Sequence, residues 1–304
     1  MTIVKAESLV KKFGSGKAEM VAVKGLSFEV ERGELFGLIG PDGAGKTSLF
    51  RMLISLLLPD TGTAVVDGCN VVTGYKELRK KVGYMPGRFS LYQDLTVEEN
   101  LQFFATIFNT SIKENYSLIK DIYIQIEPFK DRRAGKLSGG MKQKLALCCA
   151  LIHRPTILFL DEPTTGVDAV SRTEFWQMLQ RLKQEGITIL VSTPYMDEAS
   201  LCDRVALMQE GQFLTIGTPG KIVDDFGKPI LAVKSINMFH LIQNLKEAPG
   251  VEDSYSFGEY AHAVMKEDYN LVNLDTFLVQ KGLKEVEIKE VKPDIEDCFL
   301  KLMH

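Results

Sequence analysis

The sequence has no paired cysteine spacing, no long hydrophobic run and no strong excess of charge of one sign. Its five cysteines show no C-x-x-C spacing and mostly lie in apolar segments, which favours reduced core thiols in a cytosolic protein. A net charge of −4 provides no basic footprint for nucleic acid, so we expect no nucleic-acid partner. The first residues lack a signal-peptide pattern, and no apolar run approaches about 18 residues. For work at a membrane, we therefore expect another chain to hold this one there.

Composition and length place the chain among ordinary globular proteins. It has 304 residues, of which 45% are hydrophobic and 25% are charged, as is usual for globular domains. This length suffices for one large domain with an appendage, or for two domains. The composition therefore indicates a globular protein, and the function has to be inferred from local motifs.

Hydrophobic patterning predicts a mixed α/β body. Alternating apolar and polar residues at 3–9 and 21–30 indicate two antiparallel strands. Apolar strands at 156–161 and 187–192 flank a predicted helix, and this βαβ order implies a parallel sheet. Helical periodicity at about 88–150 indicates a helical insertion between the two halves of this body.

A glycine-rich turn between an apolar strand at 35–39 and a helix is the most informative stretch. The segment from Gly40 to Thr47 matches the pattern G-x-x-x-x-G-K-[ST] of phosphate-binding P-loops. The glycines allow backbone amides to converge on an anion at a helix N-terminus. Lys46 is expected to reach the phosphates, and Thr47 to bind Mg²⁺. The predicted nucleotide-binding residues are Gly40, Pro41, Asp42, Gly43, Ala44, Gly45, Lys46, Thr47 and Ser48.

The apolar strand at 156–161 ends in two carboxylates. Asp161 is the candidate for holding Mg²⁺, because P-loop proteins need a carboxylate after such a strand. Glu162 could orient or deprotonate an attacking water, which makes it the candidate catalytic residue. Taken alone, an Asp-Glu pair after a strand also fits a solvated helix start, so the assignment depends on a further motif.

That motif is the segment Leu137–Gln143, which reads Leu-Ser-Gly-Gly-Met-Lys-Gln and opens an apolar helix. Ser138, Gly139 and Gly140 would form a second helix N-terminus, able to receive a phosphate from outside. A chain with both a P-loop and this second anion site is typical of a head-to-tail ATP sandwich, in which each nucleotide lies between two chains.

With these motifs the chain resembles the ATP-binding subunits of ABC transporters, specifically those of bacterial ABC-2-type multidrug and antibiotic exporters. The resemblance extends over residues 1–226 and over the tail at 292–302. It implies a P-loop NTPase core with an antiparallel β subdomain, ATP and Mg²⁺ as cofactors, and ATP hydrolysis. It also implies a membrane permease partner at the cytoplasmic face of a bacterial inner membrane. Phe13 would stack on adenine, with a core aromatic as the alternative, and Gly166–Asp168 would touch the opposite site.

Residues beyond about 226 predict a second, smaller domain. The segment Gly227-Lys-Pro229 indicates a boundary. The elements after it follow the order βαββαβ with a final helix, which is a ferredoxin-like α+β pattern. The expected domains are therefore an ABC ATP-binding domain at 1–226 and a ferredoxin-like domain at 227–304.

Two positions depart from the family pattern. Gly87 stands where the family has a glutamine, and Pro194 stands where it has the switch histidine that contacts the γ-phosphate. Losing two polar groups around one γ-phosphate should lower the rate of hydrolysis by roughly 10²–10⁴. Asp42, in place of the usual asparagine, should be tolerated. The histidines are expected elsewhere: His153 in a surface turn, and His240, His262 and His304 in the second domain.

These departures favour a heterodimer with a second ABC chain that retains both groups, rather than a homodimer. The segment Arg88–Tyr92, with its aromatic and apolar side chains, is expected to dock on the permease. Two alternatives stay open: a regulatory subunit that binds ATP as a clamp with little hydrolysis, and a soluble ABC ATPase of translation or DNA repair. A P-loop kinase or GTPase would not need the segment Leu137–Gln143.

Overall fold

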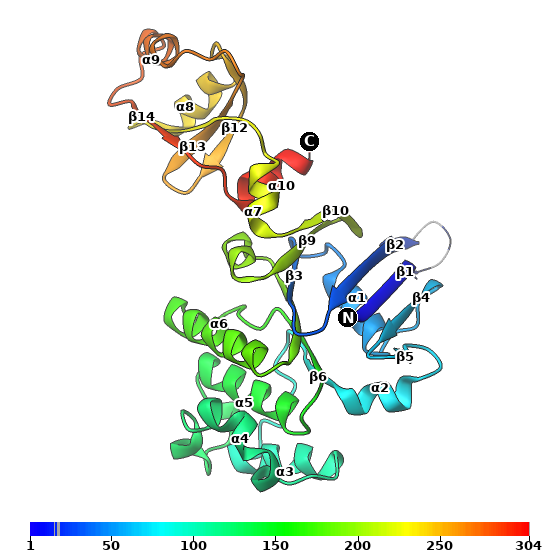
Figure 1. Ribbon diagram of the computed structural model, residues 1–304. Coiled ribbons are helices and arrows are strands. Elements are labelled where there is room, and N and C mark those ends of the chain that lie inside the picture. The colour runs from blue at the N-terminus through cyan, green and yellow to red at the C-terminus, as the bar shows by residue number, and fades with distance from the viewer. Residues whose placement is uncertain (15, 17–18, 304) are drawn as a thin grey trace. The chain divides into compact units, whose positions relative to one another are not determined.

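The computed structural model describes residues 1–14, 16 and 19–303, and it divides into two compact units (Figure 1). The first unit is Met1–Pro219 and the second is Gly220–Leu302. The first contains the glycine-rich turn, both carboxylates and the segment Leu137–Gln143. The second consists of a small sheet with its own helices.

A six-stranded sheet forms the centre of the first unit. Its strands are β3 (Leu35–Ile39), β6 (Val82–Met85), β7 (Ile157–Asp161), β8 (Thr188–Thr193), β9 (Arg204–Gln209) and β10 (Gln212–Gly217). They lie in the order β10-β9-β3-β8-β7-β6, and all neighbours are parallel except β10 and β9. Every residue of β3, β7 and β8 is buried, as expected for central parallel strands covered on both faces.

A second sheet in this unit is antiparallel, as the alternating segments predicted. It consists of β1 (Thr2–Phe13), β2 (Met20–Glu31), β4 (Thr61–Val66) and β5 (Cys69–Asn70), in the order β2-β1-β4-β5. The pairing of β1 with β2 runs to Phe13 opposite Met20, which places Phe13 at the end of its strand. Both sheets contribute to one hydrophobic core, in which the rings of Phe50 and Phe159 meet edge to face.

The helices of the first unit pack around these sheets. They are α1 (Lys46–Leu53), α2 (Tyr75–Lys81), α3 (Val97–Ile107), α4 (Ile112–Tyr123), α5 (Gly139–Leu151) and α6 (Ala169–Gln184), with a 3₁₀-helix η4 (Met196–Leu201). Helices α3, α4 and α5 come between β6 and β7 in the chain and lie together below the sheets in Figure 1. This group corresponds to the predicted helical insertion.

The second unit has the ferredoxin-like arrangement that its order of elements predicted. Its elements are α7 (Pro219–Asp224), β11 (Ile230–Lys234), α8 (Met238–Leu245), β12 (Val251–Phe257), β13 (Tyr260–Met265), α9 (Leu271–Gln280), β14 (Glu287–Val291) and α10 (Ile295–Met303). The sheet order is β12-β13-β11-β14, with all neighbours antiparallel. Its core joins β11 and β13 to α8 and α9 through residues such as Leu231, Leu241 and Leu274.

The boundary between the units lies earlier than the sequence suggested. We expected it between residues 226 and 227, whereas the compact units divide between Pro219 and Gly220. The Cys298 thiol donates to the carbonyl oxygen of Ile222 at 3.4 Å, and the Lys301 ammonium donates to that of Phe226. Because these bonds tie the segment 220–226 to α10, this segment folds with the second unit.

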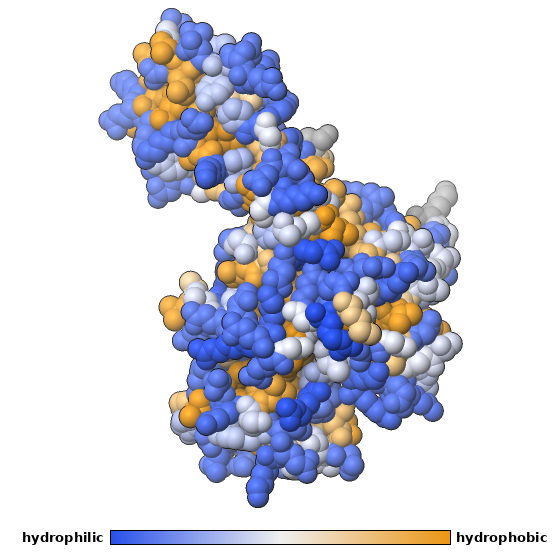
Figure 2. Space-filling model, viewed as in Figure 1, coloured by the Kyte–Doolittle hydropathy of each residue, from blue (hydrophilic) through white to orange (hydrophobic). Residues whose placement is uncertain are grey.

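The surface of the molecule is mixed in polarity. Figure 2 shows a face that is mostly polar, with apolar residues in small groups between polar ones. Among the helices of the described residues, none is both long enough and apolar enough to cross a membrane. All five cysteines are free, and Cys148, Cys149, Cys202 and Cys298 are buried, which agrees with the expected core thiols.

Candidate nucleotide-binding site

The glycine-rich turn leaves the end of β3 and enters α1 along a path that requires glycine. A Cβ atom on Gly40 would lie 2.1 Å from the carbonyl oxygen of Met208. Gly45 has a φ of +103°, and a Cβ there would lie 2.2 Å from the carbonyl oxygen of Ala22. Neither approach is possible for a residue with a side chain. The two glycines of the P-loop pattern are therefore needed for the backbone itself.

Lys46, the first residue of α1, is held inside this turn. Its ammonium group donates to the carbonyl oxygens of Gly40 at 2.7 Å and Pro41 at 2.9 Å. It also lies 3.1 Å from Oε1 of Glu162. The side chain is 3% exposed, so this positive charge is fixed at the base of the loop.

Asp161 ends β7 beside the start of α1. Its Oδ1 accepts hydrogen bonds from the Thr47 hydroxyl at 3.1 Å and the Ser192 hydroxyl at 2.7 Å. Ser192 lies on β8, the strand between β3 and β7, and pairs directly with Asp161. The sheet order thus brings the P-loop and the carboxylates to the same edge, the carboxyl ends of parallel strands, where α/β proteins bind ligands.

Glu162 follows in a conformation that is unusual for a residue with a side chain. Its φ is +50°, in the left-handed region that costs free energy without glycine. The backbone N–H of Glu162 donates to the carbonyl oxygen of Ser192 at 3.0 Å and to its hydroxyl at 3.1 Å. These bonds hold the turn, and the turn aims the Glu162 carboxylate at Lys46.

These groups line a cavity of about 190 Å³ in the first unit. The lining residues are Phe13, Met20, Ala22, Gly43, Ala44, Gly45, Lys46, Thr47, Ser48 and Glu162. The Phe13 side chain is 39% exposed, which excludes the alternative of a core aromatic. Asp42 is exposed and does not line the cavity.

The residues present fit a magnesium ion held together with phosphate. Among the described residues, no group of three His, Cys, Asp or Glu side chains could hold a metal ion without further ligands. Thr47 and Asp161 nevertheless offer a hydroxyl and a carboxylate oxygen 3.1 Å apart. Magnesium is commonly bound through one or two such protein oxygens plus substrate phosphates and water.

The predicted second anion site does not line this cavity. Ser138 is the N-cap of α5, and its hydroxyl oxygen accepts from the backbone N–H of Met141 at 3.4 Å. A Cβ on Gly140 would lie 2.8 Å from the hydroxyl of Ser171 on α6. Ser138, Gly139 and Gly140 are absent from the cavity lining. Within one chain, the structure does not bring the two phosphate-binding segments together.

Both departures from the family pattern lie next to the site. A Cβ on Gly87 would lie 3.0 Å from the carbonyl oxygen of Asp161. The backbone N–H of Gly40 donates to the carbonyl oxygen of Thr193 at 3.2 Å, so Pro194 follows a residue that is bonded to the P-loop. Gly87 therefore lies beside the backbone of Asp161, and Pro194 lies next in the chain to a residue bonded to the P-loop.

Sequence reasoning missed three residues of this site. Ser192, which bonds both Asp161 and the backbone of Glu162, was predicted only as the end of a strand. Met20 and Ala22 of β2 reach the cavity because the antiparallel sheet packs against the P-loop, and no local pattern marks them. His153 lies in a turn, as expected, but it is half-buried against the ring of Phe108. His240 and His262 lie in the second unit, and His304 lies outside the described residues.

Comparison with known proteins identifies the family. A family model described as ABC transporter matches residues 23–165. The chain is 40% identical over 287 residues to the probable multidrug ABC transporter ATP-binding protein YbhF of Escherichia coli (strain K12), covering 93% of this chain and 49% of that protein. It is 35% identical over 296 residues to the Nod factor export ATP-binding protein I of Rhizobium sp. (strain N33), covering 96% and 94%. The chain thus spans about half the length of the E. coli relative.

Solved structures of ABC transporter ATP-binding proteins resemble the first part of this chain's fold. The cbiO1 protein of Clostridium perfringens, described as part of the ABC transporter complex cbiONQ, superposes with a TM-score of 0.65 at 28% identity, covering 74% of this chain and 92% of that one. A dimeric bacterial ABC transporter cassette gives a TM-score of 0.64 at 25% identity, covering 71% and 98%. With the P-loop geometry and the match to nearly the whole rhizobial relative, these similarities show that the chain belongs to the ATP-binding proteins of the ABC transporter family.

Proposed function

We propose that this chain is the ATP-binding and ATP-hydrolysing subunit that powers an ABC-type membrane exporter. The proposal rests on two contacts at one cavity: Lys46 pairs with Glu162, and Thr47 donates to Asp161. The exposed ring of Phe13 lines the same cavity. Fixed positive charge, backbone amides at a helix start and a carboxylate pair are what phosphoryl transfer needs. The names of relatives that act in multidrug transport and Nod factor export support the exporter assignment.

Each site residue then has a role. Phe13 stacks on the adenine ring, and the amides of the segment Gly43–Ser48 with Lys46 hold the phosphates. Thr47 and Asp161 hold Mg²⁺, which when bound neutralises phosphate charge. Glu162 accepts a proton from the attacking water.

Binding of a fluorescent ATP analogue tests the site. Lys46→Ala should weaken binding at least about tenfold, which is about 1.4 kcal/mol. Lys183→Ala is the matched control, because Lys183 pairs with Asp203 and does not line the cavity. Equal binding by the Lys46 variant and the unaltered chain would refute the nucleotide assignment.

The membrane partner is a permease that docks on an apolar groove of the first unit. The groove has a volume of about 450 Å³ and is lined by residues from α2, β6, α3 and α5 and from the segments between helices and strands, among them Met85, Leu91, Phe104 and Ala146. Tyr92, which follows the lining residue Leu91, is 51% exposed and packs edge to face on Phe103 at 4.8 Å. An apolar groove rimmed by an aromatic anchor suits a helical segment of a partner.

The second partner is another ABC chain, in a heterodimer at the cytoplasmic face of a bacterial inner membrane. Gly87 and Pro194 lie beside Asp161 and the P-loop, so the missing glutamine and histidine weaken the site that this chain's P-loop builds. Ser138–Gly140 do not line that cavity, which suits their use in completing a partner's site. The clamp subunit with little hydrolysis remains the alternative, and the position of Glu162 beside Lys46 favours hydrolysis.

A further inference from the structure

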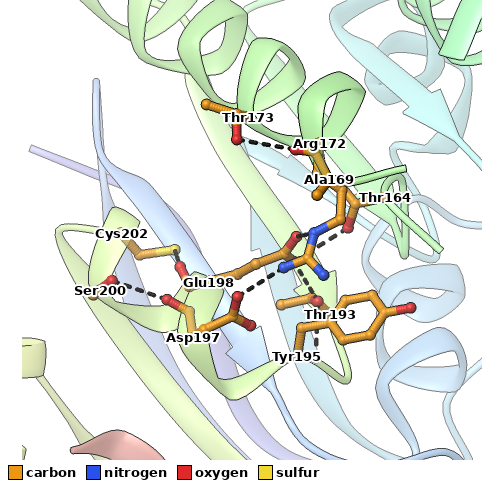
Figure 3. A network of polar contacts seen from close by, with 10 residues as sticks. All are labelled: Thr164, Ala169, Arg172, Thr173, Thr193, Tyr195, Asp197, Glu198, Ser200 and Cys202. Atoms are coloured by element: carbon orange, nitrogen blue, oxygen red, sulfur yellow. Dashed lines mark hydrogen bonds and ion pairs between the residues drawn. The ribbon is translucent and has the colours of Figure 1, made fainter. Parts of the chain in front are cut away.

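A buried carboxylate joins three segments that surround the nucleotide site. Glu198 of η4 is 2% exposed. Its Oε2 accepts from the hydroxyls of Thr193 at 2.5 Å and Thr164 at 3.2 Å. Its Oε1 lies 3.3 Å from Nε of Arg172 on α6. Figure 3 shows these side chains converging on Glu198.

Each of these partners continues to a part of the site. The carbonyl oxygen of Thr193 accepts from the P-loop residue Gly40. Thr164 follows Glu162 by two positions in the turn after β7. Arg172 lies one turn into α6, whose N-cap is Asp168. Glu198 therefore touches the P-loop side, the Glu162 turn and the segment Gly166–Asp168 through one residue each.

Arg172 is itself fixed to the segment after β8. Its Nη2 donates to Asp197 at 2.8 Å, and its guanidinium lies 4.4 Å from the ring centre of Tyr195. The backbone N–H of Tyr195 donates to the hydroxyl of Thr193 at 3.1 Å. The segment that contains Pro194 is thus attached to α6 through Tyr195 and Asp197.

We propose that Glu198 is a positioning residue that makes α6 move with the P-loop when nucleotide binds. The proposal rests on the proposed nucleotide binding at that loop. A buried carboxylate is costly unless it stays paired and hydrogen-bonded. A displacement of Thr193 that follows the P-loop must therefore carry Glu198 and Arg172 with it, and so shift the Asp168 end of α6. The connection from the P-loop to α6 thus consists of the Thr193 hydroxyl, the Glu198 carboxylate and the Arg172 guanidinium. Pro194 takes no part as a hydrogen-bond donor, because proline has no backbone N–H.

A reporter lies on the same helix. Trp176 of α6 is the single tryptophan of the chain. Its ring N–H has no hydrogen-bond partner among the residues that the structure describes, and Trp176 lines a hollow of about 530 Å³ together with Arg172 and Glu198. Because an indole responds to its surroundings, Trp176 emission measures movement of α6 against Glu198.

The experiment uses the full chain and measures two quantities separately. Calorimetry gives the affinity for MgATP, and Trp176 emission with acrylamide quenching gives the response of α6. In the unaltered chain, saturating MgATP should change the emission. Glu198→Gln and Arg172→Met should each lose most of this response while the affinity for MgATP stays within about twofold. The double variant should lose no more than either single one, because both break the same link.

Lys183→Gln is the control, because it removes an ion pair of the same helix with Asp203 outside the network. It should keep the full response. A full response in Glu198→Gln, a loss in Lys183→Gln, or no response in an unaltered chain that binds MgATP would each overturn the positioning role. Absence of binding to the unaltered chain would overturn the proposed function itself, and this role with it.

Discussion

The Lys46 ammonium lies 3.1 Å from the Glu162 carboxylate, so the P-loop lysine and the candidate general base form an ion pair across the cavity. Lys46 also donates to two carbonyl oxygens of its own loop. A phosphate that enters the loop therefore meets a positive charge that is already partnered, and a negative charge beside it. We therefore expect the two residues to have opposed effects on the affinity for nucleotide.

Removing the Glu162 charge should tighten nucleotide binding. Glu162→Gln keeps the shape of the side chain but ends the competition for Lys46 and the repulsion of phosphate, so MgATP should bind roughly three- to tenfold more tightly. Calorimetric titration measures this. Glu174→Gln is the control, since Glu174 pairs with Lys144 on the surface of α6 and should leave the affinity unchanged. Weaker binding by the Glu162 variant would contradict the opposed roles.

The second prediction concerns the proposed docking surface, which includes Phe89 and Tyr92 of the segment after Gly87. Phe89→Ala combined with Tyr92→Ala should release the protein from membranes that contain its permease into the soluble fraction, because aromatic anchors that an interface buries commonly contribute about 2 kcal/mol or more each. Nucleotide binding should be spared. Phe239→Ala removes a 70% exposed aromatic of the second unit and serves as the control. If the double variant stays with the membranes, the docking surface lies elsewhere.

The third prediction concerns the proposed inequality of the two ATP sites. It is measured as steady-state ATP hydrolysis by the complex with the proposed second ABC chain. Glu162→Gln in this chain should lower turnover only slightly, because it damages the site that we propose to be the weak one. Ser138→Arg should nearly abolish turnover by blocking phosphate at the partner's site. The pure chain should hydrolyse ATP poorly. Should Glu162→Gln prove the more damaging change, or the pure chain match the complex, the asymmetric assignment is wrong.

The fourth prediction concerns His153 and the pH dependence of the free energy of unfolding. Burial against Phe108 lowers the pKa of His153 to about 4, an effect only partly opposed by its hydrogen bond to the carbonyl oxygen of Val82. Between about pH 6.5 and pH 4 the unfolded chain binds this proton and the folded chain does not. The histidine's contribution is therefore present above pH 6.5 and is lost as the pH falls, by about 2 kcal/mol between pH 7 and pH 5.

Urea unfolding followed by Trp176 fluorescence measures this loss. His153→Phe keeps an aromatic ring against Phe108 but cannot take up a proton. Between pH 7 and pH 5 the free energy of unfolding of this variant should therefore fall by about 2 kcal/mol less than that of the unaltered chain. His240→Asn, in the second unit, should behave as the unaltered chain does. An equal fall in the His153 variant and the unaltered chain would show that another group controls the pH dependence.

Local rules explain why much of the fold was predictable. The P-loop pattern specifies its own backbone, because Gly40 and Gly45 are needed for conformations that other residues cannot adopt. The βαβ order implied parallel strands, and the order βαββαβ implied the ferredoxin-like sheet. These features depend on residues close together in the chain, so their signal survives in the sequence. The predicted domain boundary near residue 226 differs from the observed one, because hydrogen bonds between residues far apart in the chain attach the segment 220–226 to α10.

The sequence by itself determined the P-loop, the two carboxylates and the second anion-binding helix start, since each is a short pattern whose chemistry depends on its own spacing. Only the tertiary structure decided that Ser192 supports both carboxylate residues and that Phe13 faces the cavity. It also decided that Glu198 is buried and contacts Thr164, Thr193 and Arg172. Those contacts join residues from separate strands, helices and turns, which the sheet order β3-β8-β7 and the packing of α6 and η4 bring together.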